Sequence, residues 1–370
     1  MPFSEEELKI YSMHEDILYA IILSEIKGIG PVYFQRLLKR FETPRNVFKA
    51  SLSELKEVVP QTVAERVLSP DIKSAEKIIK ICERHSIEIY PYGSKGYPKR
   101  LLDIYAPPPI LYVKGDITKI DTIKSVGMVG TRKPTQYGSQ VAQIFSRELA
   151  QYGIGIVSGG AYGIDTIALK TAASENAYSV AVLGNGLLNP YPSANRELFR
   201  KIVEKGGAVI SEFNPEERPN KENFPRRNRI ISALSDALLV IEAGEKSGSL
   251  ITAAWAEEQN VDVYAVPGPI TAETSKGTNL LIQRGAKMAT SPERILDDLG
   301  IQREKKKQDI RVSEEEQKIL DIIGNEPLHA DTIAERLNME IFRLSSVLFS
   351  LELKGLIRQL PGKYYVKETL

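Results

Sequence analysis

Several residue types are scarce in this chain of 370 residues, and each scarcity excludes a class of protein. The one cysteine, Cys82, cannot form an internal disulfide, which fits a reducing cytoplasm. The three histidines, His14, His85 and His329, lack the spacing of metal ligands and are too few for a nucleophile–histidine–acid triad. Apolar runs are too short for a membrane span, and the acidic N-terminus has no signal-peptide pattern. We therefore expect a cytoplasmic protein with no metal site and no membrane partner.

Charge of one sign is also lacking, because 49 basic and 48 acidic residues leave a net charge of +1. The hydrophobic content of 42% and the charged content of 26% are ordinary for a soluble globular protein. The length suffices for two or three domains. A near-neutral chain binds a polyanion only through a local concentration of positive charge, so the placement of lysine and arginine decides this question.

Residues 1–90 are predicted to be mainly helical. Between residues 20 and 41, apolar residues recur at steps of three and four, interrupted by Gly28-Ile29-Gly30-Pro31. One interpretation is a helix-hairpin-helix, whose turn and second-helix start present backbone N–H groups to a phosphate. The other is an ordinary tight turn between two helices, and the sequence favours neither.

Residues 91–115 are rich in proline and glycine and are predicted to be a connector, because Pro107-Pro108-Pro109 favours an extended chain. Residues 116–300 alternate short apolar runs with segments of helical period, which indicates a parallel sheet covered on both faces. The predicted strands are residues 125–130, 153–158, 178–184, 207–212, 237–243 and 261–268. The predicted fold class is therefore α/β, with a doubly wound, Rossmann-like core.

Residues 301–312 are charged, have no apolar period and are predicted to be a linker. Residues 313–370 begin with a capping box formed by Ser313 and Glu316. Two more helical patterns follow, and then two β-prone segments around Pro361-Gly362 that are typical of a hairpin. Three helices and a hairpin in this order are typical of a winged helix.

Candidate binding loops follow the predicted strands, because ligands of an open parallel sheet bind beyond the carboxyl ends of its strands. These loops are rich in Gly, Ser, Thr and Asn, and glycine allows a close approach of the backbone to a ligand. Arg132, Lys246 and Lys276 follow three different strands. Arginine forks suit phosphate oxygens, so the shared composition indicates an anion site.

A cluster of three arginines, Arg226, Arg227 and Arg229, stands where a helix is predicted to begin. Positive side chains there oppose the helix dipole at about 0.3–1 kcal/mol each when exposed. A bound anion would offset that repulsion through charge-assisted hydrogen bonds. The alternative is a solvated basic loop whose arginines pair with the acidic residues between positions 216 and 222.

The first βα loop has no G-x-G-x-x-G motif and the chain has no G-x-x-x-x-G-K-[ST] motif, so no nucleotide cofactor is expected. Asp165, Glu212 and Glu242 lie near the strand ends, where such residues more often cap helices or pair with arginines than act in catalysis. Successive phosphate-binding loops without a catalytic group favour a chain of phosphates, which we interpret as single-stranded nucleic acid. The candidate stacking platforms for bases, which could equally be packing residues, are Tyr137, Tyr162 and Phe224.

A series of motifs runs in order through most of the chain. They are YPKRLLDIYAPPPILYVKG, VGTRKPTQYG, SGGAYGIDTIA, VAVLGNGLLNPYPSANREL, ISEFNP, FPRRNRIISALSDALLVIEAGEKSGSLITA, VYAVPG and GTNLLIQRGA. Together they resemble the DNA-processing protein A (DprA) family, also called Smf. The resemblance implies a Rossmann-like core that binds single-stranded DNA, loads RecA recombinase onto it in natural transformation, and forms a homodimer. It also implies a sterile-alpha-motif-like N-terminal domain, a C-terminal winged helix and no catalytic activity.

The resemblance, together with the strand-end loops, indicates a set of DNA-binding residues. They are Thr131, Arg132, Gly159, Gly160, Gly163, Phe224, Arg226, Arg227, Asn228, Arg229, Lys246, Ser247, Gly248, Ser249, Thr278 and Asn279. Two positions depart from the family pattern: Tyr162 stands where an arginine is common, and Leu169 stands where a histidine is common. The departure at Tyr162 removes one cation from a predicted DNA-binding loop.

Two other functions compete with single-stranded DNA binding. One is a nucleotide-processing enzyme of the phosphoribohydrolase kind, which shares this type of fold and would use Glu212 or Glu242 as acid or base. Such enzymes carry a Pro-Gly-Gly-x-Gly-Thr loop, which no predicted strand-end loop matches. The other is a transcription regulator led by the winged helix, whose third predicted helix offers only Arg343 in its early turns. We expect the winged helix to contact a protein, or to contact DNA weakly through its wing.

Overall fold

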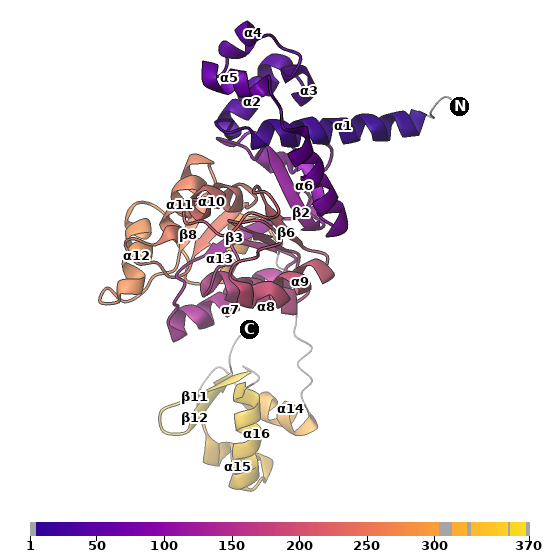
Figure 1. Ribbon diagram of the computed structural model, residues 1–370. Coiled ribbons are helices and arrows are strands. Elements are labelled where there is room, and N and C mark those ends of the chain that lie inside the picture. Colours follow the sequence, from indigo (N-terminus) through magenta and orange to yellow (C-terminus); the bar gives the residue numbers. More distant parts are fainter. Residues whose placement is uncertain (1–4, 303–312, 324–326, 354–355, 368–370) are drawn as a thin grey trace. The chain divides into compact units, whose positions relative to one another are not determined.

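The computed structural model describes residues 5–302, 313–323, 327–353 and 356–367 (Figure 1). They fall into two units, one ending at residue 302 and the other within residues 303–370. The predicted linker, 301–312, lies almost wholly outside the described residues. Within the described ranges, every helix is too short or too polar to span a lipid bilayer.

The N-terminal region is helical, as predicted. Its helices are α1 (Glu5–Glu25), α2 (Pro31–Phe41), α3 (Pro44–Val47), α4 (Leu52–Lys56), α5 (Gln61–Val67) and α6 (Ile72–Arg84). Local signals set several boundaries. Pro31 opens α2, Ser51 and Glu54 form a capping box on α4, and the Asp71 carboxylate accepts from the Ser74 amide at the start of α6. The apolar faces of these helices pack into one core cluster.

The sheet of the first unit has the strand order β1-β2-β6-β5-β4-β3-β7-β8-β9. Its strands are β1 (Glu88–Pro91), β2 (Ile110–Gly115), β3 (Ser125–Val129), β4 (Gly155–Ser158), β5 (Ser179–Val182), β6 (Ala208–Ser211), β7 (Ala237–Val240), β8 (Asp262–Ala265) and β9 (Lys287–Met288). The pairs from β6 through β9 are parallel, whereas β2 pairs antiparallel with β6 and with β1. The six strands predicted from apolar runs are confirmed as β3 to β8, and the α/β fold class is confirmed with them.

Residues 91–115 are more than a connector, which corrects the predicted boundary. Ile110–Gly115 forms β2, and its residues up to Val113 are almost fully buried. With β1, this strand extends the core sheet beyond β6. The three prolines before Ile110 concealed the strand from sequence analysis, although proline is tolerated just ahead of a strand. The helical region and the α/β core are consequently parts of one unit.

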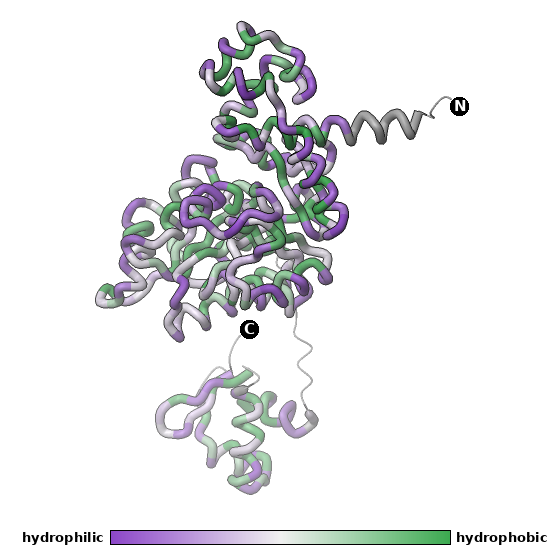
Figure 2. The backbone as a smooth tube through the Cα atoms, viewed as in Figure 1, coloured by the Kyte–Doolittle hydropathy of each residue, from purple (hydrophilic) through white to green (hydrophobic). Residues whose placement is uncertain are grey.

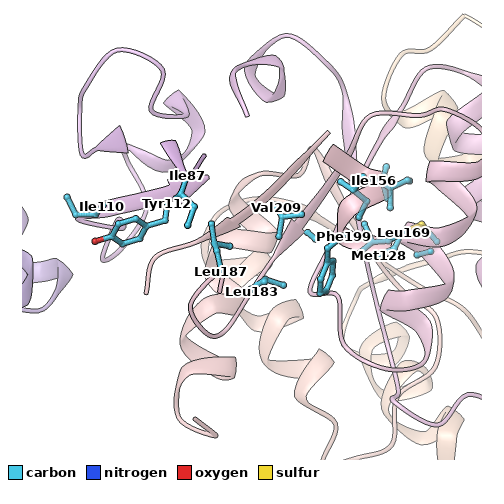
Figure 3. Packing of buried hydrophobic residues seen from close by; sticks show 14 of the residues in the cluster. Ile87, Ile110, Tyr112, Met128, Ile156, Leu169, Leu183, Leu187, Phe199 and Val209 are labelled. Carbon is cyan, nitrogen blue, oxygen red and sulfur yellow. The ribbon is translucent and has the colours of Figure 1, made fainter. Parts of the chain in front are cut away.

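Helices cover both faces of the sheet (Figure 1). They are α7 (Gln136–Gln151), α8 (Ile164–Ser174), α9 (Arg196–Glu204), α10 (Asn223–Ala233), α11 (Gly248–Glu258), α12 (Lys276–Gln283) and α13 (Pro292–Asp298), with 3-10 turns at Lys99–Leu101, Thr118–Asp121, Ser193–Asn195 and Glu273–Ser275. Met128 and Ile156 pack with α7, α8, α9 and α13, and Figure 3 shows part of that cluster. Val129 and Val157, the next residues along the same strands, pack with α10, α11 and α12. This alternation follows from the two-residue period of a strand.

Hydrophobic segments concentrate in the strands at the centre of the first unit (Figure 2). Each strand from β3 to β7 is buried along its whole length. Strands covered on both faces read as continuous apolar runs rather than as alternating ones, which explains why the sequence reveals them. The ends of these rigid strands provide fixed positions for the loops that follow.

The second unit is a winged helix, as predicted. Its elements are α14 (Glu314–Ile322), β10 (Leu328–His329), α15 (Ala330–Leu337), α16 (Ile341–Leu353), β11 (Ile357–Leu360) and β12 (Tyr364–Lys367). The predicted capping box is confirmed, because the Glu316 amide donates to the Ser313 hydroxyl at 3.2 Å and the Ser313 amide donates to the Glu316 carboxylate at 2.7 Å. Ile319, Ile333 and Leu348 lie in the core of this unit. The strand β10 was not predicted, since two residues are too few to show a period.

Candidate functional site

A cavity of about 830 Å³ lies at the carboxyl edge of the parallel strands. The loops after β3 and β7, which are neighbours in the sheet although far apart in sequence, form two of its walls. The strand order reverses between these two strands, so the cavity lies at the switch point where open α/β sheets bind ligands. Thr131 and Arg132 line it from one loop, and Lys246 and Ser247 from the other.

Backbone contacts fix the loop after β3. The Thr131 amide donates to the Glu242 carbonyl at 2.7 Å, and the Ile164 amide donates to the Thr131 carbonyl at 3.2 Å. A Cβ at Gly130 would lie 2.7 Å from the Ile164 side chain, so the position has no room for one. Gly163 has a φ of +80° and packs against the backbone of Thr131. The loop after β3 and the loop after β4 thus contact each other through their backbones. These contacts fix the positions of the polar residues that both loops carry.

Glu242 lies just after β7, and its side chain forms hydrogen bonds with the residue at the start of α7. Its side chain is buried and accepts from the Thr135 amide at 2.9 Å, the Thr135 hydroxyl at 2.6 Å and the Thr274 hydroxyl at 3.4 Å. Thr135 is the N-cap of α7, and its hydroxyl in turn accepts from the Gly138 amide. Both carboxylate oxygens of Glu242 therefore have structural donors.

A buried pair of opposite charges, Arg227 and Asp165, borders the cavity. The Arg227 guanidinium donates to the carbonyls of Gly159, at 2.7 Å, and of Val182. Burial raises the pKa of Asp165 to about 6, against the lowering effects of the Arg227 charge and the Ala161 amide. Burial lowers the pKa of Arg227 to about 10, against the raising effect of the Asp165 charge. Arg227 therefore stays positive at neutral pH and is fixed in the cavity wall.

Three aromatic rings form a row that begins in the cavity wall. The ring centroids of Phe224 and Tyr191 lie 5.8 Å apart, and those of Tyr191 and Tyr162 lie 6.3 Å apart. The Arg132 guanidinium lies 5.6 Å from the Phe224 centroid, within cation–π reach. Tyr162 is 45% exposed, and Tyr191, which lines the cavity, is 40% exposed, so a ligand in the cavity has access to the Tyr191 ring. Tyr162, at a position where the resemblance predicts an arginine, thus adds a third ring to this row.

The N-terminus of α11 opens into the cavity. Ser247 is its N-cap, and the Ser247 hydroxyl accepts from the Ser249 amide at 3.4 Å. The Asn228 side chain donates to the Gly248 carbonyl at 3.2 Å and thereby joins α10 to α11. The exposed Lys246 precedes this turn. A helix N-terminus and a lysine beside it both favour an anionic ligand.

The three arginines predicted to act together lie in different surroundings, which corrects that prediction. Arg227 is in the cavity wall. Arg229 is buried, and its guanidinium forms a two-point salt bridge with Glu212 at 2.6 and 2.7 Å. Arg226 is exposed, lies 5.6 Å from the Phe213 ring centroid and lines a second cavity of about 420 Å³. Arg229 is therefore a structural residue whose charge Glu212 neutralises.

The alternative pairing of these arginines with acidic residues 216–222 is also wrong for the two that are buried. Arg229 pairs with Glu212, and Arg227 lies beside Asp165. Glu216 instead pairs with Lys77 of α6 at 2.9 Å. That exposed contact joins α6 to the loop after β6.

Thr278 and Asn279 lie outside the cavity wall, although they belong to the predicted set of DNA-binding residues. The buried Thr278 hydroxyl donates to the Ser275 carbonyl at 3.1 Å. The Asn279 side chain bonds both the amide and the carbonyl of Gly268. The Tyr137 hydroxyl donates to a carbonyl in the same loop, at 3.0 Å. These residues shape the loop after β8, and none of them lines the cavity.

Gly159 and Gly160, which follow β4, make room for neighbouring side chains. A Cβ at Gly159 would lie 2.6 Å from Arg227 Nη2, and one at Gly160 would lie 2.8 Å from the Phe199 ring. Gly160 also has a φ of +64°, which an ordinary side chain rarely adopts. Gly159 thereby admits Arg227 to the cavity wall, and Gly160 makes room for the Phe199 ring.

The cavity wall also contains residues that the sequence did not predict, among them Tyr191, Lys221 and Ile251. Tyr191 carried a signal, because it is an aromatic residue between two prolines in a strand-end loop. Lys221 lies in the long loop between β6 and α10, where a lysine reads as an ordinary solvated charge. Ile251 lies on α11, where an apolar residue reads as part of the core, yet it is 40% exposed.

Two family models match this chain, and their limits follow the architecture. The model described as DNA recombination-mediator protein A matches residues 88–300, from β1 to beyond α13, and so contains the cavity. The chain belongs to this family, DprA/Smf. A second model, described as the DprA winged helix domain, matches residues 303–363. The resemblance inferred from the motifs is confirmed.

Individual relatives agree with this assignment. Protein Smf of Escherichia coli strain K12 is 38% identical over 313 residues, which covers 81% of this chain and 83% of that protein. The solved structure of DprA from Streptococcus pneumoniae superposes with a TM-score of 0.67 at 32% identity, covering 76% of this chain and 97% of that chain. A DprA structure from Helicobacter pylori, described as giving insights into a unique single-stranded DNA binding mode, has a TM-score of 0.52 at 32% identity, covering 58% and 95%.

Proposed function

We propose that this protein binds single-stranded DNA in the cavity at the switch point. The observation that carries the proposal is that Arg132, Arg227 and Lys246 line one cavity together with the rings of Phe224 and Tyr191. Cations that track phosphates and rings that stack on bases are the two components of single-strand binding. The Helicobacter pylori relative, whose description concerns single-stranded DNA binding, supports the same ligand.

We further propose that the protein is a binding protein and not an enzyme. The carboxylates that a nucleotide-processing enzyme would use are engaged in the fold. Glu242 accepts from Thr135 and Thr274, and Glu212 holds the buried Arg229. Release of a free base from nucleoside monophosphates by the purified protein would contradict this part of the proposal.

The biological role that we propose is to protect incoming single-stranded DNA in the cytoplasm and to load RecA recombinase onto it during natural transformation. The family description, a recombination mediator, supports this role. The same resemblance supports a homodimer formed through the Rossmann-like core.

For the winged helix we propose contact with a protein partner. Arg343, the cation in the early turns of α16, pairs with Glu315, whereas Phe342 of the same helix is 84% exposed and Phe349 is 62% exposed. A helix that reads base edges in the major groove presents polar and cationic side chains instead.

An Arg132→Ala variant tests DNA binding in the cavity. A charge-assisted contact contributes about 1.5–3 kcal/mol, so we expect a loss of about 10- to 150-fold in affinity for a labelled oligothymidylate in an anisotropy titration. The slope of log affinity against log salt should fall by about 0.7 if one phosphate contact is lost. Arg147→Ala is the matched control, because Arg147 is an exposed arginine of α7 paired with Glu175 at 3.3 Å. Equal affinity of the Arg132→Ala variant and the parent protein would refute the proposed site.

A further inference from the structure

A pair of stacked aromatic rings, Tyr105 and Trp255, lies outside the cavity. Their ring centroids are 6.3 Å apart and their planes differ by 16°. Tyr105 is 66% exposed, whereas Trp255 is partly buried beneath it. An offset stack of this kind contributes about 0.5–1.5 kcal/mol, but leaving a large ring surface in water brings no benefit to the fold. The exposed ring of Tyr105 is therefore available to a further flat group.

The helix α11 contributes both to the cavity wall and to the stacked pair. Ile251 lines the cavity and is 40% exposed, and Trp255 follows it four residues later on the same helix. Residues four apart lie on one face of a helix, and four residues advance about 6 Å along its axis. The exposed apolar side chain of Ile251 thus lies between the cavity and Trp255 on this helix.

The loop that carries Tyr105 is held in place. The buried Arg229 guanidinium donates to the carbonyl of Ala106 at 2.8 Å. The Tyr97 hydroxyl donates to the carbonyl of Pro108 at 2.9 Å, and Tyr97 itself is buried. An aromatic ring on an anchored loop loses little freedom when a ligand stacks on it, which favours binding. Arg229 thus positions Tyr105 by holding the carbonyl of the next residue, Ala106.

A carboxylate on α11, that of Glu258, favours a base over a phosphate at the stacked pair. Glu258 is exposed and lies three residues after Trp255 on α11, near the same face. A carboxylate there repels the phosphate backbone but leaves the neutral ring of a base unaffected. Bases stack on aromatic side chains with little dependence on sequence, because every base has a π-face.

We infer that Tyr105 and Trp255 form a second base-stacking subsite, which binds a nucleobase of a single strand after the strand leaves the cavity over Ile251. This inference rests on the proposed function, since the cavity must hold the first part of the strand. Full affinity then requires a DNA strand that is long enough to fill the cavity and to reach the stacked pair. Strands that fill only the cavity bind without reaching the pair.

The experiment uses the full-length protein and a length series of labelled oligothymidylates. Trp255 is the only tryptophan of the chain, so its emission reports on this subsite directly. We expect short strands to bind without changing the emission, and longer strands to quench it as the added base stacks. Emission that does not change at saturation with any strand length would overturn the inference.

Variants separate stacking from other effects. Stacking contributes about 1–3 kcal/mol per base, so Tyr105→Ala should weaken the binding of long strands by about 5- to 150-fold and leave short strands unaffected. Trp255→Phe should retain most of the affinity, because a ring remains beneath Tyr105. Ile144→Ala is the control, since Ile144 is 46% exposed on α7, in the opposite helical layer. Equal loss for short and long strands, or no loss for either, would contradict a second subsite.

Two further outcomes have distinct meanings. If the parent protein binds no strand of any length, or if Arg132→Ala binds as the parent does, the proposed function fails. If Arg132→Ala weakens binding but Tyr105→Ala does not, only the second subsite fails. A Tyr105→Ala variant that changes the mass of the free protein in solution while binding long strands normally would show that the pair covers a contact between two copies, which also overturns the inference.

Discussion

Removing the Glu212 side chain leaves the Arg229 guanidinium buried without its carboxylate partner. The exposed fractions of the two side chains are 4% and 3%, and two N–H···O contacts of 2.6 and 2.7 Å join them. Breaking a buried pair by deleting one partner costs about 3–5 kcal/mol, because the remaining charge is uncompensated. Arg229 keeps the carbonyls of Ala106 and Arg226 as acceptors, so we expect the lower end of this range for Glu212→Ala. A loss of about 3 kcal/mol lowers the folding equilibrium constant about 150-fold.

Urea unfolding followed through Trp255 emission measures this loss, because Trp255 lies in the same unit as the pair. Glu204→Ala is the matched control, since Glu204 forms an exposed pair with Arg200, and deletion of exposed pairs changes stability by about 0–1 kcal/mol. Replacing both Glu212 and Arg229 by apolar residues of similar volume should recover much of the stability. A Glu212→Ala variant as stable as the parent, or no more affected than Glu204→Ala, would refute the structural role of Arg229.

Two further predictions concern the cavity. The pKa of Asp165 is raised from 3.8 to about 6 by burial, so the folded protein resists ionisation of this carboxyl group. Stability relative to an Asp165→Asn variant should therefore fall as the pH rises from about 4 to about 6 and change little above that, and a difference that is flat or increases with pH would contradict the burial argument. A Tyr162→Arg variant adds a cation beside the aromatic row, and it should strengthen oligothymidylate binding at low salt and steepen the salt dependence by about 0.7 in slope. Ile144→Arg in the opposite layer should do neither.

The sequence predicts the strands of the core well. Strands that are buried on both faces consist of continuous apolar runs, and such runs are visible in the sequence without any knowledge of the structure. The strand β2, which lies between β1 and β6, is not predicted, since the prolines before Ile110 resemble a connector. For the site, the rule that ligands bind at strand ends brings the correct loops together, but it does not give the direction of each side chain. Successive residues of a helix point about 100° apart, so Arg226, Arg227 and Arg229 on α10 reach different surroundings.

Which of those surroundings is the cavity depends on partners that are distant in sequence. The Gly159 carbonyl, 68 residues before Arg227, fixes that side chain in the wall. Glu212, 17 residues before Arg229, neutralises the charge of the Arg229 guanidinium. Tyr191 joins the aromatic row only because the loop after β5 folds back toward α10. A local pattern contains none of this information.

The pairing of β1 with β2 has a consequence for how the chain divides. β1 directly follows the N-terminal helices, yet its backbone hydrogen bonds join it to a strand of the α/β core. A cut at residue 91, where composition changes, would strip the outermost strand from the sheet and leave a row of unsatisfied amides and carbonyls on β2, ready to recruit another chain. The helical region is thus joined to the core through β1, and a fragment that keeps this edge of the sheet intact has to begin at or before Glu88.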